Sequence, residues 1–163
     1  MAQDGRKLPA AAFTITPDPL ETADVLALLE RHLEEMHANS PACKVHALDA
    51  SRLKEPGVTF YAARIDGELA AVGALKRLGD SQGEVKSMRA ADSWRGTGAG
   101  EAILLHLIAE ARAEGLTWLG LETGQGPVFE PAHALYRKHG FAPCDAYADY
   151  VIDEFSTCMG LDL

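Results

Sequence analysis

The residues Arg95-Gly96-Thr97-Gly98-Ala99-Gly100 join a strand-like segment to an amphipathic helix. Residues 84–90 precede this glycine run and have the composition of a strand, and residues 117–122 form a second strand-like segment beyond Gly115, which is placed to end the helix. Between them, apolar side chains recur at helical spacing, at Ile103, Leu104, Leu107, Ile108 and Ala111. A strand, a helix and a strand of these lengths predict a right-handed crossover between two parallel strands.

The glycine run also favours the binding of a phosphate group. The first N–H groups of a helix have no acceptor within the helix and lie at the positive end of its dipole, so they attract anions. Gly98 and Gly100 leave room for a pyrophosphate to approach the backbone, and Gly96 permits a tight turn. We therefore expect a nucleotide-type cofactor, although a glycine-rich turn also occurs as a plain connection.

Two other phosphate-binding motifs fit the run less well. A Walker loop would close with Gly-Lys-Ser/Thr, but Glu101 follows Gly100, which disfavours ATP hydrolysis. A Rossmann fingerprint would need a third glycine where Glu101 stands, although Glu122 lies about where an acid would bind the ribose. A dinucleotide-binding oxidoreductase is therefore kept as a minor alternative.

The composition is that of one globular domain. The chain has 163 residues, of which 47% are hydrophobic and 24% charged. We expect a flexible N-terminal extension over residues 1–14 and a single domain over residues 15–163. The sequence has no apolar run of about 18 residues and no secretory signal, so no membrane span is expected. The net charge of −9 argues against a nucleic-acid partner, because such surfaces gather Lys and Arg.

The cysteines and histidines do not form a recognisable metal site. Cys43, Cys144 and Cys158 are odd in number and far apart, which favours reduced thiols and a cytoplasmic location. His32 and His37 are five residues apart, whereas ligands on one helix face are usually separated by about four. We therefore expect no metal.

The remaining segments predict an α/β (α+β) fold. Asp66-Gly67 between two apolar runs is a strong hairpin signal, and Pro131 suits the first turn of a helix that Gly140 ends. The elements expected are helices at 20–39, 49–55 and 131–140, and strands at 58–65, 69–76, 141–144 and 155–161. The result is a mixed central sheet in which an antiparallel meander precedes the parallel crossover, with helices on both faces.

Two motifs in this order resemble the GNAT (general-control-related N-acetyltransferase) superfamily. Its signature, Arg/Gln-x-x-Gly-x-Gly/Ala, is met by Arg95, Gly98 and Gly100, and residues 132–141 match a second family motif that contains Tyr136. The resemblance covers residues 20–163. Three further segments look like the small bacterial branch called YsnE-like: Val45-His46-Ala47-Leu48-Asp49, Lys86-Ser87-Met88-Arg89 and Leu121-Glu122-Thr123-Gly124.

This resemblance implies that acetyl-coenzyme A binds in a cleft where the strands containing Glu84 and Glu122 separate. The pyrophosphate would rest on the amides of Arg95, Gly96, Thr97, Gly98, Ala99 and Gly100, with Arg89 and Arg95 adding positive charge. The pantetheine arm would pair with the backbone of Met88, Arg89 and Ala90. Many family members have Asn seven residues before the tyrosine, and Phe129 stands there in this chain.

The resemblance also implies direct transfer of the acetyl group to a primary amine of a small-molecule or amino-acid-like acceptor in a ternary complex. A protonated amine must lose a proton before it can attack a thioester, and Glu84 or Glu122 could accept it. Tyr136 would donate to the departing sulfur, and a backbone N–H near Met88 would stabilise the oxyanion. A non-catalytic coenzyme A-binding regulatory module is the alternative, and a homodimer is left open.

Overall fold

A mixed β-sheet runs through the computed structural model, which describes residues 7–41 and 49–163. Within these residues the sheet has seven strands in the order β1-β2-β3-β4-β5-β7-β6. The strands are β1 (Thr14–Pro17), β2 (Val58–Ile65), β3 (Glu68–Arg77), β4 (Gln82–Ala90), β5 (Trp118–Gly124), β6 (Ala142–Pro143) and β7 (Ser156–Asp162). The predicted mixed sheet is confirmed, and β1 is a strand that the sequence analysis did not predict.

The first half of the sheet is an antiparallel meander. Strands β2 and β3 pair antiparallel around the turn at Asp66-Gly67, where both residues have positive φ angles of 49° and 82°. Two consecutive left-handed residues are typical of a type I′ hairpin turn, which matches the right-handed twist of the strands. The hairpin prediction is confirmed, and β4 continues the meander by pairing antiparallel with β3.

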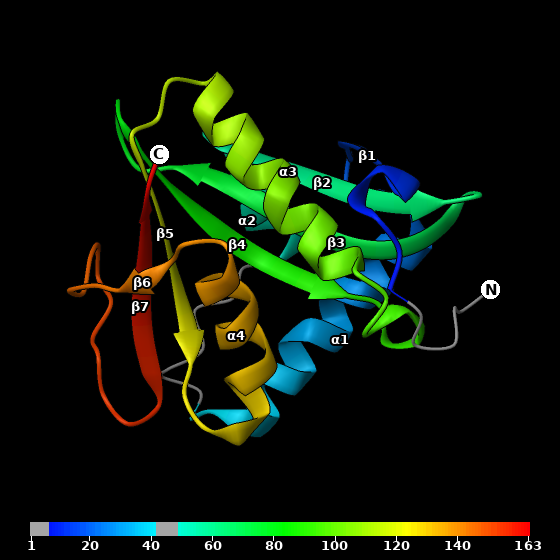
Figure 1. Cartoon of the computed structure of the whole chain (residues 1–163). Coiled ribbons are helices and arrows are strands. Elements are labelled where there is room, and N and C mark those ends of the chain that lie inside the picture. Colours follow the sequence, from blue (N-terminus) through cyan, green and yellow to red (C-terminus); the bar gives the residue numbers. More distant parts are fainter. Residues whose placement is uncertain (1–6, 42–48) are drawn as a thin grey trace.

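A helix connects the meander to the second half of the sheet. Helix α3 (Ala99–Ala113) leads from β4 to β5, and these two strands pair in parallel as predicted. The parallel pairing is short: residues Gln82–Glu84 of β4 pair with residues Trp118–Gly120 of β5. Figure 1 shows that β4 and β5 then diverge, so the sheet opens between them.

Helices cover both faces of the sheet (Figure 1). Helices α3 and α4 (Glu130–Lys138) lie on one face, and α1 (Ala23–Asn39) and α2 (Ala50–Leu53) lie on the other. Each face has its own cluster of buried apolar side chains, one around α3 and one around α1 and α2. None of the helices in the described part of the chain is long and apolar enough to cross a membrane.

The helix ends follow the predicted stop and start signals. Gly115 and Gly140 have φ angles of +81° and +95° just beyond α3 and α4, where a left-handed residue ends a helix. Pro131 lies in the first turn of α4, and the Asp49 carboxylate caps α2 by accepting a hydrogen bond of 3.0 Å from the Arg52 N–H. The predicted elements are therefore present with small shifts of their ends.

Residues 7–13 pack against the domain, whereas the sequence analysis expected a flexible extension over residues 1–14. The Leu8 N–H donates to the Thr97 carbonyl over 2.7 Å, and Phe13 is buried with its ring centroid 6.2 Å from that of Trp94. The burial of the apolar Phe13 side chain stabilises the packing of this segment against the rest of the domain. Residues 1–6 and 42–48, the latter including Cys43 and the segment from Val45 to Leu48, lie outside the described residues.

Candidate active site

A cavity of about 160 Å³ lies where β4 and β5 diverge. Residues from α1, β4, β5 and α4 line it, together with Phe129 and Phe155 from two connecting segments. These lining residues include His32 and Met36 of α1 and Ser40 just beyond it, Glu84 to Met88 of β4, Leu121 to Gly124 of β5, and Ala132 and Tyr136 of α4. The cavity therefore brings together the three residues expected to be catalytic: Glu84, Glu122 and Tyr136.

A β-bulge shapes the β4 side of the cavity. In the β3–β4 ladder Val72 pairs with Arg89 and Ala74 with Lys86, so Ser87 and Met88 together oppose the single residue Gly73. Ser87 has a φ of +51°, which is rare for a residue other than glycine, and its buried hydroxyl has no hydrogen-bond partner among the described residues. The bulge changes the direction of the β4 backbone at the cleft.

Met88 of the bulge, and Arg89 and Ala90 beyond it, lie on a part of β4 that no longer pairs with β5. The last parallel pair joins Glu84 to Gly120, so the β4 backbone from Val85 onward faces the opening instead of a neighbouring strand. Such an edge can accept an extended ligand through main-chain hydrogen bonds, in the way that a sheet accepts an added strand. The backbone of these residues fits the expected role in holding a pantetheine arm.

The side chains of Arg89 and Arg95 are paired within the protein. The Arg89 guanidinium contacts the carboxylates of Glu35 at 2.5 Å and Asp92 at 3.1 Å, and Arg95 contacts Glu35 at 3.1 Å. These hydrogen bonds from the two guanidinium groups lower the pKa of Glu35. Both arginines therefore direct their charge toward α1, and the positive charge expected beside a phosphate is shared with these acids.

The glycine run turns the chain into α3 as predicted. Gly96 and Gly98 have φ angles of +76° and +95°, and α3 begins at Ala99 without a side chain capping its first amides. The side chains of Thr97 and Ala99 are buried, and the Thr97 hydroxyl donates to the Trp94 carbonyl over 2.5 Å. These two side chains fix the turn, so the run offers a ligand its backbone amides.

The glycines of the run differ in what surrounds them. A Cβ atom added to Gly98 would lie 2.8 Å from the Leu8 carbonyl oxygen, whereas one added to Gly100 would meet nothing within 4 Å. Protein packing and the positive φ thus require glycine at position 98. At Gly100 the protein leaves open space against the backbone, which is what the close approach of a ligand requires.

A second cavity of about 300 Å³ lies between the start of α3 and α4. Lys7, Gly96, Gly98, Glu101 and Lys138 line it, with Ala134 and Leu135. The Glu101 carboxylate is 2.8 Å from the Lys7 ammonium and 2.7 Å from both the Lys138 ammonium and the His139 ring. Hydrogen bonds from Lys138, Lys7 and His139 lower the pKa of Glu101 to about 2, so three basic side chains gather beside the glycine run.

Glu84 is buried, and three neighbouring side chains contact one oxygen of its carboxylate. It is 2% exposed, and its carboxylate accepts hydrogen bonds of 2.7 Å from the Tyr147 hydroxyl and 2.5 Å from the Tyr150 hydroxyl. The Lys86 ammonium lies 3.8 Å from the same carboxylate and donates to the Tyr150 hydroxyl over 2.7 Å. Glu84 is thus held as the acceptor of a hydrogen-bond network.

Glu122 lies on β5 and lines the cavity with Lys86 and Tyr136. The pKa of Glu122 is raised to about 7, chiefly by burial; the charge of Lys86 opposes this rise, and the charge of Glu84 adds to it. A carboxylate with a pKa near neutrality can take up and release a proton under physiological conditions. Of the two predicted acids, Glu122 therefore has the properties of a general base.

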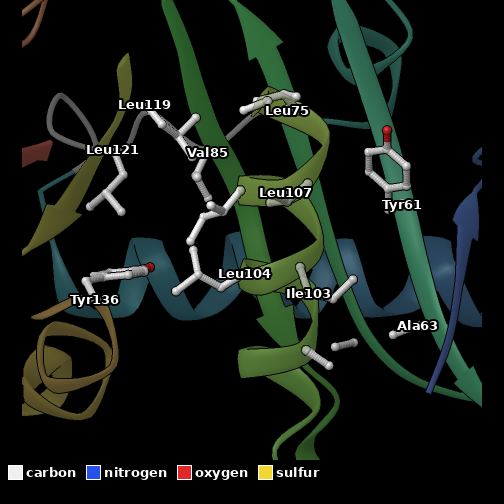
Figure 2. Close-up of a cluster of buried hydrophobic side chains, with 14 of the residues drawn as sticks. Tyr61, Ala63, Leu75, Val85, Ile103, Leu104, Leu107, Leu119, Leu121 and Tyr136 are labelled. Carbon is white, nitrogen blue, oxygen red and sulfur yellow. The ribbon is translucent and has the colours of Figure 1, made fainter. Parts of the chain in front are cut away.

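Tyr136 projects from α4 into the edge of the buried cluster (Figure 2), with its hydroxyl directed toward the side of Leu104. The ring lies 5.9 Å from that of Phe141, and the residue is 8% exposed. Burial raises the pKa of the phenol to about 12, so the hydroxyl keeps its proton at neutral pH. Tyr136 is therefore available as a hydrogen-bond donor to a group in the cavity.

Phe129 takes the place of the family's asparagine and closes the end of β5. Its ring lies over Gly124, where an added Cβ atom would be only 2.3 Å from the ring carbons. The side chain is buried and lines the cavity. This wall of the cavity is therefore apolar, and an amide contact to a cofactor is replaced by an aromatic surface.

Several residues of the site were not identified from the sequence. His32 was considered only as a metal ligand, but it lines the cavity, and burial lowers its pKa to about 4. Tyr147 and Tyr150 lie in the irregular segment between β6 and β7, and Lys7 lies far from α4 in sequence. Among the described residues no group of three His, Cys, Asp or Glu side chains could hold a metal ion.

Comparison with known proteins agrees with this geometry. Residues 25–141 match the model of the acetyltransferase (GNAT) family. YedL, an uncharacterized N-acetyltransferase of Escherichia coli, is 42% identical over 93% of this chain and 95% of its own length. YsnE, an uncharacterized N-acetyltransferase of Bacillus subtilis, is also 42% identical, over 87% of this chain and 94% of its own.

Solved structures share the fold. A crystal structure from Klebsiella pneumoniae is 29% identical with a TM-score of 0.75, over 94% of this chain and 99% of that one. A Bacillus subtilis acetyltransferase in complex with CoA has a TM-score of 0.68 at 21% identity, over 93% and 99% of the two chains. These matches favour an acyltransferase over the two alternatives considered from the sequence, a dinucleotide-binding oxidoreductase and a non-catalytic CoA-binding module. The chain belongs to the GNAT family and is an N-acetyltransferase of its bacterial YsnE-like branch.

Proposed function

We propose that this N-acetyltransferase transfers the acetyl group of acetyl-CoA to a primary amine of a small-molecule or amino-acid-like acceptor, by direct attack in a ternary complex. The observation that carries this proposal is that Glu122 and Tyr136 line one cavity at the opening between β4 and β5. One group is suited to accept a proton and the other to donate a hydrogen bond. Bound acetyl-CoA supplies the thioester on which the amine acts.

Glu122 is the general base in this proposal. With a pKa near 7 it is partly ionised at neutral pH, and it can take a proton from an ammonium directly or through water. Glu84 is a poor alternative, because the hydroxyls of Tyr147 and Tyr150 and the ammonium of Lys86 already occupy its carboxylate. Glu84 therefore serves the site without meeting the acceptor.

Tyr136 stabilises the departing sulfur in this proposal. A phenol with a pKa of about 12 is a weaker acid than an ordinary thiol, whose pKa is about 8.5. Full proton transfer from Tyr136 to a thiolate is thus unfavourable, but a hydrogen bond to the developing negative charge is favourable in a buried site. We therefore assign Tyr136 the role of hydrogen-bond donor.

Backbone groups hold the acyl donor in this proposal. The β4 edge over Met88–Ala90 suits the pantetheine arm, and the amides at the start of α3, which no side chain caps, suit the pyrophosphate. The Thr97 N–H is already used within the turn, because it donates to the Trp94 carbonyl. The second cavity lies beside these amides, with Lys7 and Lys138 on its wall. The CoA complex of the Bacillus subtilis acetyltransferase, which shares the fold, supports this choice of acyl donor.

The direct test is acceptor-dependent release of CoA thiol from acetyl-CoA across a panel of primary amines and amino acids. We expect turnover with at least one amine and intersecting lines in initial-rate plots, as a ternary complex requires. Glu122→Gln should lose most of this turnover and still bind CoA. A parallel-line pattern with an acetylated protein intermediate, detected by mass spectrometry, would overturn the direct mechanism.

A further inference from the structure

Glu84, Lys86 and Glu122 share one face of the sheet. Glu84 pairs in register with Gly120, and residues two apart on a strand point to the same side, so Lys86 and Glu122 lie on the face that Glu84 occupies. Lys86 lies two residues after Glu84 on β4, and Glu122 lies two residues after Gly120 on β5, so both are just beyond the last parallel pair. The two side chains therefore face each other across the opening, and both line the cavity.

The segment between β6 and β7 covers this face and carries two tyrosines. The Tyr147 ring meets the Trp118 ring edge-on at 5.2 Å and the Tyr150 ring at 5.1 Å. The Tyr150 N–H also donates to the Tyr147 carbonyl over 3.1 Å, so the two residues form one turn. Their hydroxyls both reach Glu84, while the Tyr150 ring lies 5.3 Å from the Lys86 ammonium.

Hydrogen bonds and a nearby opposite charge compensate the burial of Glu84 and Lys86. A buried carboxylate is tolerated when it accepts several hydrogen bonds, and Glu84 accepts two and lies beside an ammonium. Burial lowers the pKa of Lys86, and the nearby charge of Glu84 counteracts this. The two tyrosines thus hold a negative and a positive charge in fixed places near Glu122.

These fixed charges act on Glu122 in opposite directions. The positive charge of Lys86 favours the ionised form of Glu122, and the negative charge of Glu84 favours the protonated form. Asp153 and the Ser156 hydroxyl act from the segment before β7 and from β7, and Cys158 of β7, Tyr150 and His32 of α1 also face this region. Lys86 and Glu84 are the two charged side chains of β4 that act on Glu122.

We propose that Lys86 and Glu84 are positioning residues that set the proton affinity of Glu122 from opposite sides, and that Tyr147 and Tyr150 hold them in place. This proposal rests on the proposed function in one respect only: the effect of Lys86 and Glu84 on Glu122 matters for catalysis if Glu122 is the general base. The electrostatic coupling itself is a property of the free protein and can be measured without any acceptor.

The test is an NMR titration of the Glu122 side-chain carboxyl carbon in the full chain, with its signal assigned by its loss in Glu122→Gln. We expect Lys86→Gln to raise the titration midpoint of Glu122 and Glu84→Gln to lower it, each on the order of one pH unit. Lys76→Gln is the matched control. Lys76 lies opposite Glu84 on β3, so this substitution removes the same charge one strand farther from Glu122. It should shift the midpoint by much less.

Tyr147→Phe is a second variant in case Glu84→Gln does not fold. It removes one hydrogen bond that favours the charged form of Glu84. The negative charge of Glu84 is then held less firmly, so the midpoint of Glu122 should move downward as in Glu84→Gln, by less than about half of a unit. Shifts of equal sign in Lys86→Gln and Glu84→Gln, or no shift in either, would overturn the proposal. A purely structural role would lower the melting temperature and leave the midpoint where it is.

The pH profile of kcat/KM separates this proposal from the proposed function. If Glu122 is the base, the acidic limb of the profile should move upward in Lys86→Gln and downward in Glu84→Gln, in parallel with the NMR midpoints. If the NMR midpoints move and the limb stays, the coupling holds and the assignment of Glu122 as the base fails. If neither moves, the positioning role fails whatever the reaction is.

Discussion

Gly98 and Gly100 belong to one run and are glycines for different reasons. At Gly98 the φ of +95° and the Leu8 carbonyl oxygen 2.8 Å from a Cβ position make any side chain costly to the fold itself. At Gly100 the protein has open space, so only a ligand would meet a new methyl group. Substitution of Gly98 therefore cannot report cofactor binding alone, and Gly100 is the better probe.

Gly100→Ala should weaken the binding of CoA by about tenfold or more, because the methyl group would stand where the pyrophosphate approaches. Its melting temperature should be unchanged or higher, since Ala is favoured over Gly within a helix by about 1 kcal/mol. Calorimetric titration with CoA and thermal unfolding measure the two effects. Gly98→Ala is the comparison, and it should lower the melting temperature. Wild-type affinity in Gly100→Ala would place the pyrophosphate elsewhere.

Tyr136→Phe should reduce kcat by about 10- to 100-fold, because it removes the hydroxyl that stabilises the departing sulfur. The affinity for CoA and the melting temperature should change little, since the ring keeps its packing beside Phe141. Steady-state kinetics with one accepted amine and calorimetry with CoA are the measurements. An unchanged kcat would show that the hydroxyl does not take part in the chemistry.

Glu122→Gln should stabilise the protein more at pH 8.5 than at pH 5. The pKa of Glu122 is about 7 in the folded state and about 4.3 in an unfolded chain, so folding favours its protonated form. The stability associated with that form is complete below about pH 4 and is lost as the pH rises through about 7. Gln mimics the neutral form at every pH, so the gain in melting temperature should be small at pH 5 and larger at pH 8.5. Thermal unfolding at both pH values checks this, and equal gains at the two would contradict the raised pKa.

The segment before β1 brings Lys7 to the start of α3, where it faces Lys138 of α4 across the second cavity. If the cofactor's phosphates lie there, Lys7→Gln combined with Lys138→Gln should weaken CoA binding several-fold and flatten its salt dependence. Arg112→Gln, which removes a cation at the other end of α3, should leave both unchanged. Titration with CoA at two salt concentrations distinguishes these outcomes, and equal losses in both variants would point to net charge alone.

The elements differ in how far their sequence could predict them. The glycine run, the Asp66-Gly67 hairpin and the helix of Tyr136 are encoded by residues close in sequence, so local rules identified them. Strand β1 is short and mostly exposed, and its pattern carries little signal. The contacts of Tyr147 and Tyr150 with Glu84 join residues more than 60 positions apart, so they emerge only from the topology of the sheet. The choice between Glu84 and Glu122 likewise depended on partners that no local pattern contains.

For the whole molecule, the proposed binding mode would add the acyl donor to the sheet at the opening between β4 and β5. The two halves of the sheet pair through only three residue pairs between β4 and β5, so a ligand that bonds to the β4 edge should stabilise both. At 100 times its dissociation constant, CoA should add about 2.7 kcal/mol to the free energy of unfolding. A rise in melting temperature with CoA, and a smaller one for Gly100→Ala at the same concentration, would agree with this. A CoA-independent melting temperature would contradict it.

Backbone and side chains of β4 also have separate roles in the proposed site. Main-chain atoms near the bulge are proposed to bind acetyl-CoA, and these atoms are the same whichever side chains the strand carries. Side chains that line the cavity can change one at a time without altering that backbone. Descendants of such an enzyme could therefore acquire new substrates by point mutation while the means of gripping the acyl donor passes from one generation to the next intact.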